Sequence, residues 1–260
     1  MVSYNSTHFL ARLAQSLRTS DRIASVTIVD NHSSDDSVKL AESLNWGAPH
    51  FVVPLQENVG FGAAMNRGAF APGRLGSQIL IVNPDVSVGR ETLGVLSDNL
   101  IRTPNLAAVG AVLRTETGLP VSSARDFPSP HTIARRIVRE VDHGGAFIEA
   151  DWICGALMLW DRQAFIEVDG FSSDYFLYYE DVDACQKARA SGWSIMIDGS
   201  QNAIHDQGHG NPTSQLLRRA ARTSRRRYAR KWYGPRGAIS AFVADSIDFA
   251  AAIYHKLRGR

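Results

Sequence analysis

The chain has 260 residues, 44% of them hydrophobic and 21% charged, which is typical of a globular protein with a buried core. The formal net charge of +2 combines an acidic body, with 16 basic against 24 acidic residues in 1–211, and a basic tail, with 12 against 2 in 212–260. Two cysteines exclude a disulfide scaffold. With no secretion signal and no run of roughly 20 apolar residues, we expect a cytoplasmic protein.

The first half of the chain alternates helical and β-branched patterns. Apolar residues at helical spacing follow the capping cluster Asn5–Thr7 and predict a first helix. Strands are expected at 26–29, 51–54, 78–82 and 107–113, and helices near 36–45, 61–70 and 90–102. This alternation predicts an α/β fold in which helices flank a parallel sheet.

The second half is less regular at first. Residues 114–150 contain scattered prolines and glycines and read as a connection or lid. A buried strand is then expected at 152–160, helices at 162–168 and 181–191, and strands at 193–197 and 202–204. A helix at 213–232 carries eight Lys or Arg and no acid, and an apolar helix follows at 239–257.

Polar residues follow three of the expected strands, at 30–31, 57–58 and 83–85. Ligands of open α/β sheets bind beyond the carboxyl ends of the strands, so we expect these segments to meet in one crevice. Asp85 is placed to ligate a divalent cation held by diphosphate oxygens, although Asn-Pro-Asp is also a common turn. Asp30 can accept a hydrogen bond from a base or ribose, or simply form a turn.

The segment 57–66 is a glycine-containing turn that leads into a helix of small residues. Small residues let the backbone approach a ligand, and a helix N-terminus favours phosphate. The third glycine of the dinucleotide fingerprint is missing, which argues against an oxidoreductase.

Three carboxylates, Glu180, Asp181 and Asp183, follow an aromatic cluster at the start of an expected helix. Aromatic walls raise the proton affinity of a carboxylate, as a general base requires, but the acids could equally stabilise the helix dipole. Near the end of the body, His205 lies with Asp206 and His209, which favours a metal site about as much as a structural role.

Taken in order, these segments resemble the family-two glycosyltransferases of the GT-A fold, and among them the bacterial rhamnosyltransferases of cell-envelope polysaccharide assembly. The resemblance covers roughly residues 3–232. Its pieces are Ser3–Asn5, Val29–Ser33, Glu57–Gly62, Asn83–Asp85, Cys154–Ala156, Gly170–Phe171, Tyr175–Tyr178, Glu180–Asp183 and His205.

The resemblance implies a Rossmann-like, mostly parallel central sheet and a nucleotide-diphosphate sugar as donor. The implied donor-binding residues are Tyr4, Asn5, Asp30, Asn58, Gly60, Asn66, Asn83 and Asp85. Asp30, with Tyr4, corresponds to the contact with base and ribose. Asp85 corresponds to the metal-binding acid of the DXD motif, with His205 as a further ligand for Mg²⁺ or Mn²⁺.

On the acceptor side, Asp181 corresponds to the catalytic base and Glu180 to the neighbour that orients the acceptor. The expected domain comprises residues 1–211, with a donor half of about 1–113 and an acceptor half of about 150–211, and 212–260 form a basic helical extension. Departures occur at 169–173, where the family's Gly-Gly-Phe-Asp-Glu reads Asp-Gly-Phe-Ser-Ser, and at the first strand, which offers only residues 1–3.

The resulting hypothesis is inverting transfer of a sugar, rhamnose from dTDP-rhamnose by resemblance, to a glycan or polyprenyl-linked hydroxyl. The Arg218–Lys231 cluster could contact an anionic membrane at the inner face of the plasma membrane, or be a solvated helix. The alternatives are a metal-dependent nucleotidyltransferase and a nucleic-acid-binding protein. The first lacks a basic glycine-rich loop, and the second is disfavoured by the acidic body, so we expect no nucleic-acid partner.

Overall fold

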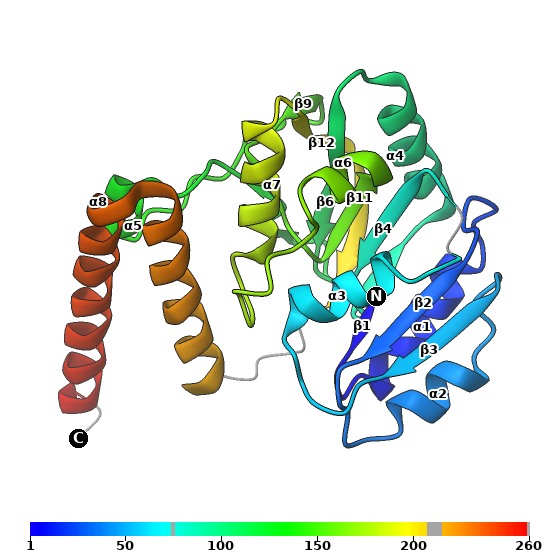
Figure 1. Cartoon of the computed structure of the whole chain (residues 1–260), viewed down its shortest axis with the longest axis horizontal. Coiled ribbons are helices and arrows are strands. Elements are labelled where there is room, and N and C mark those ends of the chain that lie inside the picture. The colour runs from blue at the N-terminus through cyan, green and yellow to red at the C-terminus, as the bar shows by residue number, and fades with distance from the viewer. Residues whose placement is uncertain (74–75, 207–214, 259–260) are drawn as a thin grey trace.

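The computed structural model describes residues 1–73, 76–206 and 215–258. These residues form a three-stranded sheet, a seven-stranded sheet and the two-stranded sheet β10-β8 (Trp152–Ile153 with Ala124–Arg125), together with the helices labelled in Figure 1. The first part contains β1 (Val2–Ser3), α1 (Thr7–Leu17), β2 (Val26–Asp30), α2 (Ser37–Ser43), β3 (His50–Pro54), α3 (Phe61–Ala69), β4 (Gln78–Val82), β5 (Val86–Val88), α4 (Arg90–Arg102) and β6 (Leu106–Arg114).

The remaining elements are β7 (Pro120–Val121), β8 (Ala124–Arg125), α5 (Pro130–Arg135), β9 (Phe147–Glu149), β10 (Trp152–Ile153), β11 (Leu157–Asp161), α6 (Arg162–Glu167), α7 (Glu180–Ala190), β12 (Ser194–His205) and α8 (Gln215–Arg258). Four short elements, β7, β8, α5 and β9, thus lie within 114–150, which periodicity did not resolve.

The smaller sheet is parallel, in the order β1-β2-β3. Its central strand β2 is rich in β-branched residues, and Val29 lies opposite both Val2 and Val53. Helix α1 packs its predicted apolar stripe, Leu10, Leu13 and Leu17, into the core. This part confirms the predicted alternation of strands and helices.

The larger sheet runs in the order β4-β11-β6-β12-β5 and is mixed. Strand β11 is antiparallel to both of its neighbours, β4 and β6, whereas β6 and β12 are parallel. Every residue of β6 from Leu106 to Leu113 is buried, as expected for a central strand covered on both faces. The α/β fold is therefore confirmed, although parallel pairing is confined to β1–β3 and to β6 with β12.

Two expected strands have different bounds. The strand expected at 152–160 is broken into β10 and β11 by Cys154–Ala156, which leaves the sheet in a turn. The two short strands expected at 193–197 and 202–204 form one long strand, β12, whose register with β6 shifts between Asp198 and Asn202. Its final residue, His205, lies opposite Val86.

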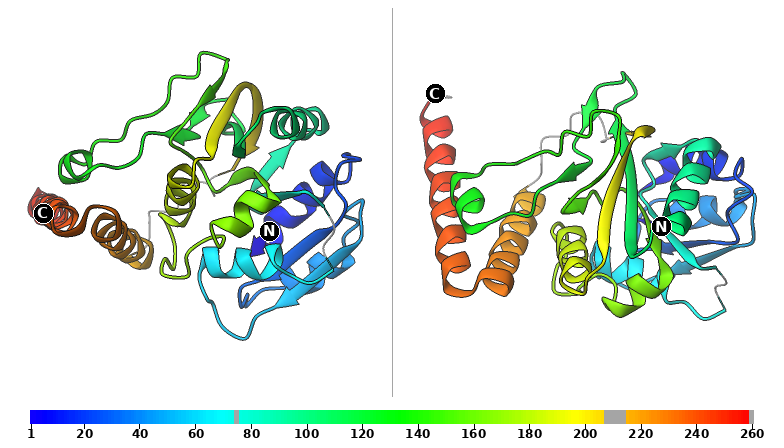
Figure 2. Two further views of the ribbon diagram at one scale, coloured as in Figure 1. Left: turned by 45° about the horizontal axis from the view of Figure 1, so that its top comes forward. Right: turned by 90° about the horizontal axis from the view of Figure 1, so that it is seen from above.

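Helix α8 consists of two arms joined at Gly234, whose φ of 56° and ψ of −136° break the helix before Pro235. We call residues 215–233 the first arm and residues 235–258 the second arm. Figures 1 and 2 show the arms side by side, with the second arm outermost. Helix α5 lies beside the arms, and Arg136, which follows α5, pairs with Asp248 of the second arm. The predicted boundary between 211 and 212 lies outside the described residues.

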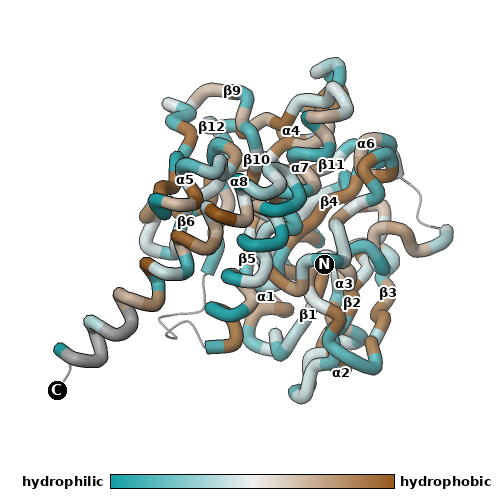
Figure 3. Tube along the Cα trace, turned by 60° about the vertical axis from the view of Figure 1, so that its left-hand side comes forward, coloured by the Kyte–Doolittle hydropathy of each residue, from teal (hydrophilic) through white to brown (hydrophobic). Residues whose placement is uncertain are grey.

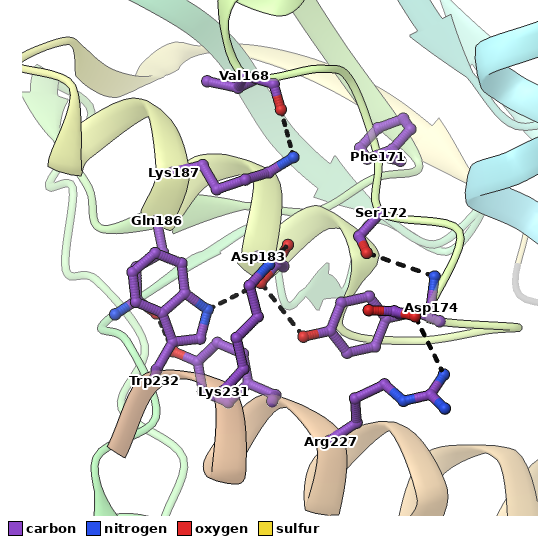
Figure 4. A network of polar contacts seen from close by, with 12 residues as sticks. Val168, Phe171, Ser172, Asp174, Asp183, Gln186, Lys187, Arg227, Lys231 and Trp232 are labelled. Atoms are coloured by element: carbon purple, nitrogen blue, oxygen red, sulfur yellow. Dashed lines mark hydrogen bonds and ion pairs between the residues drawn. The ribbon is translucent and has the colours of Figure 1, made fainter. Parts of the chain in front are cut away.

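The first arm is tied to the body through a buried carboxylate (Figure 4). Asp183, which is fully buried, accepts hydrogen bonds from Lys231 Nζ (2.8 Å), Trp232 Nε1 (2.8 Å) and the Tyr175 hydroxyl (3.2 Å). Buried charge is tolerated when it is paired and fully hydrogen-bonded, so this network fixes the first arm against α7.

Replacing Asp183 by Ala should lower the free energy of unfolding by about 3 kcal/mol or more, because it leaves the donors of Lys231 and Trp232 without their buried acceptor. Urea unfolding measures the change. As a control, Asp36→Ala removes an exposed partner of Lys39 and should cost less than about 1 kcal/mol. Equal losses in the two variants would show that the network does not anchor the helix.

Candidate active site

A pocket with a volume of about 350 Å³ lies at the carboxyl ends of β1, β2 and β4. Phe176, Leu177 and the start of α8 close its other side. We call it the strand-end pocket. Six residues predicted from the sequence line it, namely Tyr4, Asn5, Asn58, Gly60, Asn83 and Asp85. The expected convergence of 57–58 and 83–85 on one crevice is therefore observed.

Asn31 also lines this pocket, as expected for the segment 30–31, although it was not among the implied donor-binding residues. Its side-chain nitrogen donates to Asn58 Oδ1 at 2.9 Å, and its oxygen accepts from the backbone N–H of Val59 at 2.9 Å. Asn5 similarly accepts from the backbone N–H of Ser34 at 2.8 Å. Through these hydrogen bonds, Asn31 and Asn5 hold the loops that form the pocket wall in place. The sequence signal for Asn31 was its position directly after β2.

Asp30 and Asn66 do not line the strand-end pocket. Asp30 is buried, and its two oxygens accept from the backbone N–H (2.9 Å) and hydroxyl (2.6 Å) of Ser33. Asn66 uses both polar atoms on the backbone of Phe171, at 2.7 and 3.0 Å. Both side chains therefore shape loops beside the pocket, and the expectation that Asp30 lies on the cleft wall is not met.

Asp85 and His205 come together because β5, which follows Asp85, pairs with the end of β12. His205 Nε2 lies 3.4 Å from Asp85 Oδ2. Three buried polar atoms here have no hydrogen-bond partner within the described part of the chain: Asp85 Oδ1, His205 Nδ1 and Asn83 Oδ1. Buried polar atoms normally find partners, so this group points to a missing ligand. His209, considered with His205 from the sequence, lies outside the described residues.

No group of three or more His, Cys, Asp or Glu that could hold a metal ion occurs among the residues described. A hard divalent cation does not require such a group, because Mg²⁺ typically binds one or two carboxylates together with phosphate oxygens and water. The donor set of Asp85, with His205 and Asn83 beside it, fits a cation that is also bound by a diphosphate.

A second pocket, of about 580 Å³, lies between α5, the start of α7 and the first arm of α8. Glu180 and Asp181 line it together with the exposed apolar side chains of Ile137 and Val138. Its basic lining residues are Arg125, Arg136, Arg139, Arg218 and Arg225. We call it the α5–α8 pocket. It adjoins the strand-end pocket, because Leu217 lines both and the continuous segment 176–182 passes from one to the other.

The turn Cys154–Ala156 connects the two pockets. Asp181 Oδ2 accepts a hydrogen bond from the backbone N–H of Gly155 at 2.9 Å, and the backbone N–H of Asn83 donates to the carbonyl of Ala156 at 2.9 Å. A Cβ atom at Gly155 would lie 3.3 Å from the Asp181 carboxylate, so glycine permits this close approach. Since neighbouring Cα atoms are only about 3.8 Å apart, Asn83 and Asp181 attach to the same small piece of backbone.

The environments of the two acids differ. Burial raises the pKa of both Glu180 and Asp181, and for Glu180 the neighbouring Asp181 charge raises the pKa further, to well above its ordinary value. The N–H groups of Gly155 and Val182 oppose the rise for Asp181, since they favour its ionised form. These N–H groups favour ionisation of Asp181 over that of the buried Glu180, whose Oε2 has no hydrogen-bond partner among the described residues.

Strained backbone precedes these acids. Tyr178 and Tyr179 both have positive φ, 68° and 72°, which is unfavourable for residues with a large side chain. The ring of Tyr179 packs against Tyr228 of the first arm at 5.1 Å, and the hydroxyl of Ser224 donates to the Leu177 carbonyl at 2.8 Å. Helix α8 thus holds the strained turn in place, and the turn directs Glu180 and Asp181 into the α5–α8 pocket.

The family model described as "Glycosyl transferase family 2" matches residues 1–152. Over 245 residues the chain is 28% identical to the N-acetylglucosaminyl-diphospho-decaprenol L-rhamnosyltransferase of Mycobacterium tuberculosis, covering 83% of this chain and 78% of the relative. Over 83 residues it is 34% identical to the rhamnosyltransferase WbbL of Escherichia coli K12, covering 31% of each.

The fold is similar to that of the mannosyltransferase PcManGT of Pyrobaculum calidifontis, solved in complex with GDP-Man and Mn²⁺. The TM-score is 0.64 at 16% identity, over 99% of this chain and 78% of that one. These similarities favour a glycosyltransferase over the nucleotidyltransferase and nucleic-acid-binding alternatives. The chain belongs to glycosyl transferase family 2, close to the bacterial cell-envelope rhamnosyltransferases, and is a nucleotide-sugar-dependent enzyme.

Proposed function

We propose that the protein is an inverting glycosyltransferase that moves rhamnose from dTDP-rhamnose to a hydroxyl group of a lipid-linked diphosphate sugar. The observation that carries the proposal is that one residue lining each pocket, Asn83 in the strand-end pocket and Asp181 in the α5–α8 pocket, is hydrogen-bonded to the same turn, Cys154–Ala156. The rhamnosyl donor and lipid-linked acceptor rest on the similarity to the mycobacterial enzyme.

In this proposal the nucleotide lies in the strand-end pocket, where Tyr4, Asn31 and Asn58 form the wall. The acceptor sugar lies in the α5–α8 pocket beside the two acids. Asp181 removes the proton of the acceptor hydroxyl as its oxygen attacks the anomeric carbon from the face opposite the diphosphate. This single displacement inverts the anomeric configuration. Glu180, beside Asp181 in the same pocket, orients the acceptor by hydrogen bonding.

Asp85 and His205 would hold a divalent cation, Mg²⁺ or Mn²⁺, with Asn83 beside them. When bound, the cation supplies positive charge where negative charge develops on the leaving diphosphate. Support comes from the unpartnered oxygen atoms of Asp85 and Asn83 and from the Mn²⁺ in the mannosyltransferase of similar fold. Asp30 would act indirectly, by fixing the Ser33 loop next to the pocket.

The lining of the α5–α8 pocket suits an acceptor that is both anionic and apolar. The consecutive residues 136–139, Arg-Ile-Val-Arg, all line this pocket, so a phosphate group and the first part of a lipid chain could bind next to each other. Such an acceptor would bring the protein to a membrane surface.

Replacing Asp181 by Asn should reduce sugar transfer by a factor on the order of 10² to 10⁴, because a general base is removed, while nucleotide binding stays unchanged. Steady-state transfer assays and calorimetric titration of the nucleotide measure the two effects. Asp174→Asn changes an exposed acid in the loop before α7 and serves as the control. Normal turnover by the Asp181 variant would mean that the base has been misassigned.

Replacing Glu180 by Gln should alter how stability depends on pH. Its raised pKa means that the folded protein binds the proton more tightly than the unfolded chain, so the free energy of unfolding falls as pH rises above the ordinary glutamate value of 4.5. Glu180→Gln should flatten this fall. Urea unfolding at about pH 5 and about pH 8 tests it, with exposed Glu42→Gln as control. Parallel curves for wild type and Glu180→Gln would contradict the assignment.

Mg²⁺ or Mn²⁺ should strengthen the binding of dTDP, and replacing Asp85 by Asn should remove about 10- to 100-fold of that metal-dependent gain. Calorimetric titration of dTDP, UDP and GDP with and without the cation identifies both the nucleobase and the metal requirement. Asp36→Asn, on the exposed end of α2, is the control. The metal assignment is wrong if the Asp85 variant retains the full gain.

A further inference from the structure

We propose that the outward face of the second arm of α8 binds the surface of an anionic lipid bilayer. The proposal deepens the proposed function by naming the surface on which the enzyme works. It rests on the side chains of this arm. Acidic side chains face the protein and large apolar side chains are exposed, which is the reverse of an ordinary surface helix. Among the residues described, no helix is long and apolar enough to cross a membrane, so the inferred contact lies along the bilayer surface.

The two acidic residues of the second arm face the protein. Between Ile239 and Tyr254 the only charged residues are Asp245 and Asp248. Asp245 is buried and pairs with Arg225 and Arg226 of the first arm. Asp248 pairs with Arg225 at 2.7 Å and with Arg136, which follows α5, at 3.0 Å. These ion pairs fix which side of the second arm faces inward.

The opposite side is apolar and exposed. Figure 3 shows that hydrophobic residues recur along the second arm. The large apolar side chains there, each between 40% and 70% exposed, are Ile239, Phe242, Val243, Ile247 and Phe249. At 3.6 residues per turn, these five positions fall on one face of the helix and form a stripe along it. Contiguous apolar surface of this kind is rare on monomeric proteins and usually marks a site of interaction.

A basic hollow lies on the neighbouring first arm. Thr223, Arg226, Arg227, Arg230 and Lys231 line it on the first arm. Arg226 also bonds to Asp245, so the hollow borders the second arm. Lys231 and Arg225 of the predicted Arg218–Lys231 cluster are engaged in bonds within the protein. The structure therefore shifts the main membrane contact from that cluster to the apolar stripe, with the exposed arginines as its flank.

An anionic bilayer fits this combination better than a second copy of the chain. Aromatic and aliphatic side chains next to arginines match the region between headgroups and acyl chains. The arginines complement anionic lipid headgroups. Pairing the stripe with itself in a symmetric dimer would instead bring two basic hollows towards each other. The second arm is also the outermost element of the molecule, so a flat surface can reach it (Figures 1 and 2).

Flotation of the full chain with vesicles tests the proposal. The wild type should float with vesicles of equal parts phosphatidylglycerol and phosphatidylcholine, and less with phosphatidylcholine alone or at high salt. The double variant Phe242→Ser, Phe249→Ser should reduce the floated fraction about tenfold or more, because two exposed aromatic anchors are lost. The matched control Ile101→Ser, Leu119→Ser removes two similarly exposed apolar side chains elsewhere and should float like the wild type.

The proposal is overturned if the wild type does not float or if the Phe242, Phe249 variant floats equally well. It is also overturned if sedimentation velocity shows a wild-type dimer that this variant converts to a monomer without any vesicle binding. Sugar transfer to a soluble acceptor should be unchanged in the variant. Because flotation does not depend on turnover, failure of the proposed activity and failure of the bilayer contact give different results.

Discussion

The structure depends most on the turn Cys154–Ala156, which interrupts what the sequence pattern predicted to be one strand. Its two peptide groups make one hydrogen bond to the Asp181 carboxylate and one to the backbone of Asn83. Without this interruption, β10 and β11 would continue as one strand and Asp181 would lose the N–H group that stabilises its charge. The turn therefore positions Asp181, the proposed base, relative to Asp85. Its N–H group also favours the ionised form of Asp181.

A second constraint comes from the opposite end of the chain. The first arm of α8 pairs with buried Asp183, packs Tyr228 against Tyr179 and bonds to the Leu177 carbonyl. Two consecutive residues with positive φ cost about 1–3 kcal/mol each, so they persist only where the surroundings hold them. The basic helix that appeared from its charge to be an appended tail is thus part of the proposed acceptor site.

Much of the fold could be predicted, because the spacing of apolar residues distinguishes helices from strands. Polar residues that directly follow a strand, in turn, indicate the candidate site. The apolar stripe of α1 and the β-branched run of β2 placed these elements, and Asn58, Asn83 and Asp85 were recognised because polar residues directly follow strands. The order of the motifs then indicated the family. The mixed sheet could not be predicted, because the direction of β11 depends on long-range pairing that leaves no mark on its apolar pattern.

Other features depend on three-dimensional contacts alone. Asp30 was recognised as polar and strand-terminal, but its oxygens are used by Ser33, three residues later. Asn66 was assigned by resemblance to the pocket, yet it reaches Phe171, far along the chain. The inward direction of Asp245 and Asp248 was equally hidden, because in sequence they only interrupt an apolar helix. Their partners, Arg225 and Arg136, become visible only once α5 and the two arms are packed.

The central claim is that the Asp85 group and Asp181 face one reaction site across the Cys154–Ala156 turn. A crystal structure with dTDP and Mn²⁺, in which anomalous scattering locates the metal, tests this most directly. The account predicts the ion at Asp85 and His205, with the terminal phosphate between it and the mouth of the α5–α8 pocket, where Asp181 lies. An ion bound elsewhere, or a terminal phosphate directed away from Asp181, would contradict it.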